Sequence, residues 1–111
     1  MDFAKRIAKI IADKHGTDIV IIDISGLSSF ADFFVNATAS NVRLLDTIVQ
    51  EVDRQLSAGG IEPKSMEGKP SSGWVLADYG DVIVNLFLDE QRNKYQIEKL
   101  WSDGVFVEFD E

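Results

Sequence analysis

Two carboxylates, Asp78 and Asp81, flank Tyr79 and Gly80 within the segment EGKPSSGWVLADYGDVIVNLF, residues 67–87. Paired carboxylates can hold a divalent cation or act as general acid and base, and a surface carboxylate can also bind a basic partner. The pair therefore has three alternative interpretations: a catalytic site, a ligand clamp, or part of a surface that binds another macromolecule.

Nucleotidyl transfer is the catalytic hypothesis to consider, because a strand, a helix and an acidic hairpin resemble the core of that superfold. Such a site needs a Gly-Ser pair at the helix start and two carboxylates one residue apart on a strand, so that both share Mg²⁺. Here the helix opens with TASN, residues 38–41, and Asp78 and Asp81 are three residues apart across a turn. The sequence therefore predicts a protein that is not an enzyme. The alternative that stays open is a degenerate or divergent nucleotidyltransferase-fold enzyme that binds a nucleotide.

The other residue types add no catalytic or metal-binding pattern. The chain has no Cys and a single His, His15, so thiol chemistry and Cys-based zinc sites are excluded and one His makes a weak metal site. The sequence contains no phosphate-binding Gly-rich loop and no Ser-His-Asp set. We expect no catalytic residue, no metal and no cofactor.

Charge indicates the class of partner. The net charge of −8 comes from 19 acidic and 11 basic residues, with no cluster of Lys and Arg, so the sequence predicts no direct DNA binding. It favours a basic protein partner, although acidic charge also serves solubility. No apolar run approaches the roughly 20 residues of a membrane helix, and the N-terminus does not resemble a signal peptide. We therefore expect no membrane association and a cytoplasmic location.

Hydrophobic periodicity and turn residues divide the chain into the elements of one small domain, residues 1–111. Asp2, Ser40 and Asp89 are the expected helix N-caps, and residues 61–73 are expected to form a long surface loop. The expected elements are a helix over 3–15, an interior strand over 17–25, a strand over 33–39, a helix over 40–58, a hairpin over 74–88, a helix over 90–101, and an edge strand or packed acidic tail over 105–109. The order α-β-β-α-β-β-α(-β) predicts an α/β fold with a single small mixed β-sheet flanked by helices.

The hairpin presents the candidate partner-binding residues. Alternation places Trp74, Leu76 and Asp78 on one face of its first strand, and Tyr79 is expected to project beside the turn. Aromatic side chains mixed with a few polar groups and Arg are typical of protein interfaces, although Trp74 and Phe87 equally suit a core. The residues expected to contact a partner are Trp74, Leu76, Asp78, Tyr79, Asn85, Phe87, Arg92 and Tyr95.

Three motifs carry a resemblance to a known family. They are IIDISGLSSFADFFV at residues 21–35, the segment 67–87 quoted above, and EQRNKYQIEKLW at residues 90–101. Together they make nearly the whole chain similar to the ribosomal silencing factors, the RsfS or Iojap family. The resemblance implies a nucleotidyltransferase-like α/β fold without enzymatic activity.

The resemblance also implies a function in translational repression. It implies binding to ribosomal protein L14 on the large ribosomal subunit, which blocks association with the small subunit and lowers translation under nutrient limitation. An acidic chain fits such a partner, because ribosomal proteins are typically basic. The family usually has His where this chain has Asn85, which forms hydrogen bonds but is not cationic near neutral pH. Homodimer formation stays open.

Overall fold

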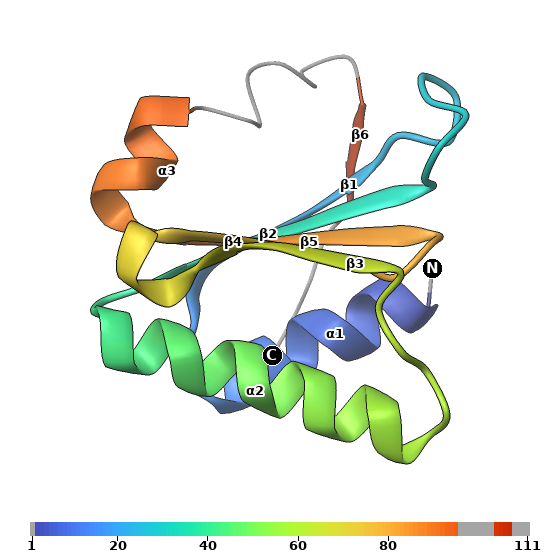
Figure 1. Ribbon diagram of the computed structural model, residues 1–111. Helices are drawn as coiled ribbons and strands as arrows, with labels where there is room; N and C mark the ends of the chain where they lie inside the picture. Colours follow the sequence, from blue (N-terminus) through green and yellow to red (C-terminus); the bar gives the residue numbers. More distant parts are fainter. Residues whose placement is uncertain (1, 96–103, 108–111) are drawn as a thin grey trace.

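A six-stranded sheet forms the centre of the computed structural model, which describes residues 2–95 and 104–107 (Figure 1). The elements are α1 (Asp2–Asp13), β1 (Thr17–Asp23), β2 (Phe33–Ala39), α2 (Val42–Ala58), β3 (Ser65–Lys69), a 3₁₀ turn (Pro70–Ser72), β4 (Trp74–Asp78), β5 (Val82–Leu88), α3 (Asp89–Tyr95) and β6 (Val105–Val107). The strand order is β3-β4-β5-β2-β1-β6, with β2 and β5 parallel and the other neighbours antiparallel. The predicted α/β class and single mixed sheet are confirmed.

Helices α1 and α2 cover one face of the sheet, the lower one in Figure 1. Apolar residues at spacings of three and four give each helix one buried side, which includes Ile7 of α1 and Leu45 and Ile48 of α2. These side chains pack in one cluster with Val35 and Val84 of the central strands. Burial of this apolar surface holds both helices on the sheet.

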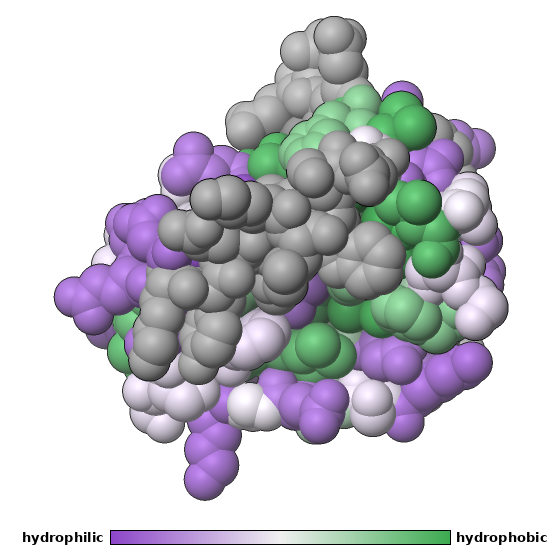
Figure 2. Space-filling model, turned by 90° about the horizontal axis from the view of Figure 1, so that it is seen from above, coloured by the Kyte–Doolittle hydropathy of each residue, from purple (hydrophilic) through white to green (hydrophobic). Residues whose placement is uncertain are grey.

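The second face of the sheet carries α3 and the segment 24–32, above the sheet in Figure 1. A smaller apolar cluster forms there from Ile22, Ile24, Ala31, Phe34 and Ile83. Figure 2 views this side of the molecule and shows apolar residues gathered on one half, with polar residues around the edge.

None of the helices in the described ranges is long and apolar enough to cross a membrane.

Strand β1 is an interior strand, as the sequence predicts. It lies between β2 and β6, and its neighbouring residues Ile21 and Ile22, on opposite faces of the sheet, are both fully buried. Strand β6 pairs antiparallel with β1, so the edge-strand alternative is confirmed over Val105–Val107. Residues 108–109, and the part of the predicted third helix beyond Tyr95, lie outside the described residues.

The prediction of a long surface loop over 61–73 is wrong. Strand β3 pairs antiparallel with β4, and the 3₁₀ turn follows it. All five residues of β3 are exposed, so this edge strand has no apolar alternation from which it could be predicted. Gly68 has φ +83°, and a Cβ there would lie 2.2 Å from the carbonyl oxygen of Trp74, so only glycine permits this approach of β3 to β4.

The helix N-termini also differ slightly from the prediction. The N-cap of α2 is Asn41 rather than Ser40, and its Oδ1 accepts a hydrogen bond from the backbone N of Leu44 at 2.8 Å. Both residue types are good caps, and the start of a helix is often one residue away from the predicted position. Asp2 and Asp89 are the first residues of α1 and α3 rather than preceding caps, where their carboxylates favour the helix dipole.

Candidate partner-binding face

The hairpin of β4 and β5 has the two faces that alternation predicts. Trp74 lies opposite Phe87 and Leu76 lies opposite Asn85, so these four side chains share the second face of the sheet. Trp74 and Leu76 are half-buried, whereas Asn85 and Phe87 are fully buried. Of these four residues, the two from β4 therefore reach the surface, and the two from β5 pack beneath them.

One carboxylate of the acidic pair, that of Asp78, forms a hydrogen bond within the hairpin turn. Asp78 Oδ1 accepts a hydrogen bond from the backbone N of Gly80 at 2.8 Å, and the backbone N of Tyr79 donates to the carbonyl of Val82 at 2.9 Å. Gly80 has φ +91°, which suits glycine. Asp78 thus stabilises the hairpin turn. Within the described ranges, no three His, Asp or Glu side chains gather in a metal-binding arrangement.

A chain of buried hydrogen bonds crosses three strands beneath this face. Trp74 Nε1 donates to Asn85 Oδ1 at 3.1 Å, and Asn85 Nδ2 donates to Asn36 Oδ1 at 3.1 Å. Asn36 and Asn85 are both fully buried, and the ring of Trp74 stacks on Phe87 with centroids 5.3 Å apart and 25° between the ring planes. Hydrogen bonds between buried polar groups are costly to break. The series of bonds from Asn36 through Asn85 therefore orients the indole of Trp74. This buried role of Asn36 was not predicted from the sequence. A polar Asn inside the otherwise apolar run FFVNATA could have indicated it.

Arg92 anchors α3 to the sheet. Its guanidinium donates to Thr38 Oγ1 at 2.8 Å and to the carbonyl oxygen of Asp18, so it connects α3 with β2 and β1. This half-buried Arg has a structural role within the chain besides the partner contact predicted for it. Tyr95 is the last residue of α3, and its side chain lies outside the described residues.

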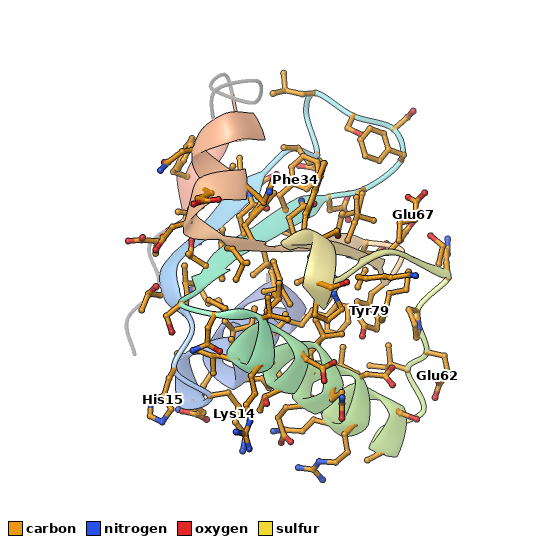
Figure 3. All side chains as sticks on the ribbon, turned by 60° about the vertical axis from the view of Figure 1, so that its left-hand side comes forward. Lys14, His15, Phe34, Glu62, Glu67 and Tyr79 are labelled. Atoms are coloured by element: carbon orange, nitrogen blue, oxygen red, sulfur yellow. The ribbon has the colours of Figure 1, made fainter. Side chains whose placement is uncertain are left out.

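The expectation that Tyr79 projects beside the turn is wrong. Its side chain is 7% exposed and packs in the core on the side of α1 and α2, because alternation continues past Asp78 and directs the next residue to the opposite face. Figure 3 shows Tyr79 beneath the sheet and Glu67 above it. Burial raises the pKa of the Tyr79 hydroxyl to about 12, and the carboxylates of Asp53 and Glu62 add to this effect. The hydroxyl has no hydrogen-bond partner.

A groove of about 280 Å³ lies on the second face at the β3 edge of the sheet. Its lining comes from Glu67 and Gly68 of β3, Ser72 of the 3₁₀ turn, and Trp74 and Leu76 of β4. Glu67 lies opposite Leu76 across the strands, so its exposed carboxylate belongs to the same face as the Trp74 indole. Glu67 was not predicted as a site residue, because its segment was interpreted as a loop. Only the alternation of a strand assigns a side chain to one face of a sheet.

Comparison with known proteins identifies the family. The family model described as "Ribosomal silencing factor during starvation" matches residues 1–111. The chain belongs to this family. It is 37% identical to ribosomal silencing factor RsfS of Bacillus subtilis, over 96% of this chain and 93% of that protein. It is 30% identical to the chloroplastic protein Iojap of Arabidopsis thaliana, over 96% of this chain and 44% of that protein.

Solved structures share the fold of this chain. A crystal structure of a protein from Chromobacterium violaceum matches with a TM-score of 0.85 and 31% identity, over 100% of this chain and 92% of that chain. A second, from Bacillus halodurans, matches with a TM-score of 0.84 and 31% identity, over 98% of this chain and 100% of that chain. The resemblance to the ribosomal silencing factor family, predicted from three motifs, is therefore confirmed.

Proposed function

We propose that this protein is a translational repressor that binds the large ribosomal subunit at ribosomal protein L14. Its bulk then blocks association with the small subunit and lowers translation in the cytoplasm under nutrient limitation. The observation that carries the proposal is the match of the silencing-factor family model to residues 1–111, whose description names starvation.

The second face of the sheet is the proposed docking surface. Trp74 and Leu76 offer half-buried apolar side chains, Glu67 offers an exposed carboxylate, and Leu27 and Phe30 of the segment 24–32 are 49% and 59% exposed. Protein interfaces combine an apolar centre with a polar rim in this way. The net charge of −8 favours association with a basic ribosomal protein.

Co-sedimentation with isolated ribosomal subunits tests the proposal. We expect the protein to pellet with the large subunit and not with the small one. Binding should weaken as salt is added, because exposed charges are screened beyond about 8 Å at physiological ionic strength. Adding the protein to a mixture of free subunits should lower the fraction that joins on a sucrose gradient. Pelleting with the small subunit, or unchanged joining despite binding to the large one, contradicts the proposal.

A charge reversal on the proposed surface has a matched control. Glu67→Lys should weaken binding to the large subunit by about tenfold or more, equivalent to about 1.4 kcal/mol, because it places like charges together. Glu62→Lys makes the same change of charge at an exposed residue near the end of α2, away from this face (Figure 3), and should have little effect. Equal effects of the two substitutions would indicate that only net charge matters. Asp78→Lys is a poorer probe, because Asp78 also stabilises the turn.

Nucleotide binding is the alternative function, and calorimetric titration with Mg²⁺–ATP tests it. We expect no binding, because the sequence has neither the Gly-Ser pair nor the carboxylates one residue apart that such a site needs. Asp78 also uses a carboxylate oxygen in the hairpin turn. Micromolar binding that Asp78→Asn abolishes would favour the degenerate or divergent nucleotidyltransferase over the binding module.

A further inference from the structure

We propose that the groove lined by Glu67, Trp74 and Leu76 receives a single arginine side chain of the basic protein partner. The inference rests on the proposed function, since it specifies one contact of that docking surface. The groove of about 280 Å³ lies just below the range of typical small-molecule sites, roughly 300–1,000 Å³. Its size is sufficient for one inserted side chain.

The chemistry of the lining matches a guanidinium group. Trp74 and Leu76 provide aromatic and aliphatic walls, and Glu67 provides a carboxylate. A guanidinium is planar and weakly hydrated, so it packs on such walls while its N–H groups bind a carboxylate. An ammonium group is more strongly hydrated and gains less from apolar walls.

The negative charge of the groove is not neutralised by a neighbouring cation in the described part of the chain. Both ion pairs found there lie within helices α1 and α2. Lys69, the nearest basic residue along β3, lines a different hollow together with Arg43 and Asp46 of α2. Among the residues that line the groove, Glu67 alone carries a charge. Ser72, which also lines it, donates its hydroxyl to the backbone carbonyl of Lys69 at 2.7 Å.

Hydrogen bonds to the indole and the close packing of β3 on β4 preorganise the groove. The indole of Trp74 is held by its bond to Asn85, which is itself bonded to the fully buried Asn36. Gly68 allows β3 to lie against Trp74, because any Cβ at this position would collide with the Trp74 carbonyl. A site held in its binding shape loses less entropy on association.

Nuclear magnetic resonance titration with n-butylguanidinium tests the inference without any ribosomal component. The reporter is the indole N–H signal of Trp74, which Trp74→Phe distinguishes from that of the second tryptophan of the chain. We expect saturable shifts at millimolar concentration for n-butylguanidinium and none for the neutral analogue n-butylurea. Glu67→Gln should weaken the binding about fivefold, as one solvent-exposed ion pair allows, whereas Glu62→Gln should leave it unchanged.

Equal shifts with n-butylurea, or shifts that Glu67→Gln leaves unchanged, would overturn the inference. So would shifts with n-butylguanidinium that appear only in residues outside the groove. Because the probe is a small molecule, such a failure is distinct from a failure of the proposed function, which co-sedimentation with the large subunit judges alone. When both hold, Glu67→Gln should also weaken binding to the large subunit while the folded protein keeps its wild-type unfolding midpoint.

Discussion

Removal of the Tyr79 hydroxyl should stabilise the protein. The side chain is 7% exposed in the core between the sheet and helices α1 and α2, and its hydroxyl oxygen is buried without a hydrogen-bond partner. Folding therefore removes a polar group from water without compensation. Tyr79→Phe keeps the ring and deletes only the uncompensated group, so the folded state should gain free energy relative to the unfolded chain.

The magnitude follows from the cost of burying an unpaired hydroxyl. Protein mutational data place this cost at roughly 1–3 kcal/mol, and we expect Tyr79→Phe to raise the free energy of unfolding by about 1 kcal/mol. For a chain of 111 residues, this corresponds to a rise in Tm of about 4 °C. Tyr79→Ala is different, because it also deletes the ring and leaves a cavity, which costs roughly 3–5 kcal/mol for a large aromatic side chain. Tyr79→Ala thus cannot separate a loss of binding from a loss of folding.

Urea titration and calorimetry of the wild type and Tyr79→Phe measure the effect. A destabilisation of about 1 kcal/mol or more would refute the reasoning, because it would mean that the hydroxyl makes a favourable hydrogen bond in solution. Binding to the large subunit should be unchanged in Tyr79→Phe, since the residue lies beneath the sheet, away from Glu67 and Trp74 (Figure 3). Loss of binding by a fully folded Tyr79→Phe protein would instead place the docking surface on the side of α1 and α2.

Three further perturbations have defined outcomes. The wild type should lose stability relative to Tyr79→Phe as pH rises from about 10 to about 12 in urea titrations, because folded Tyr79 keeps its proton up to a pKa of about 12 while the unfolded chain releases it near 10. Asn41→Ala removes the acceptor of the Leu44 N–H at the start of α2 and should lower the free energy of unfolding by about 1 kcal/mol; an unchanged urea midpoint would show that water replaces the cap. Gly68→Ala combines positive φ with a collision against the Trp74 carbonyl and should cost about 1–3 kcal/mol, so a wild-type Tm would contradict the close approach of β3 to β4.

The hairpin faces could be predicted because they depend on local alternation. Trp74 and Leu76 on one side, with Tyr79 on the other, follow from the period of two along a strand. The consequence for Tyr79 was nevertheless misjudged, since alternation says which side a residue is on but not which side the helices cover. Strand β3 could not be predicted for a related reason, because a fully exposed edge strand has no apolar pattern. Since Glu67 lies in β3, it was not included among the predicted site residues.

The sequence by itself determined the α/β class, the helices α1 and α2, the hairpin and the acidic surface, because each depends on residues close along the chain or on composition alone. Three motifs also sufficed to indicate the ribosomal silencing factor family. Only the tertiary structure decided the strand order, which places Asn36 beside Asn85, residues that are 49 apart in the chain. The same pairing ties Trp74 to the core and so shapes the groove beside Glu67. Contacts of this kind arise when the sheet closes around a shared core, and no local pattern of residue types specifies them.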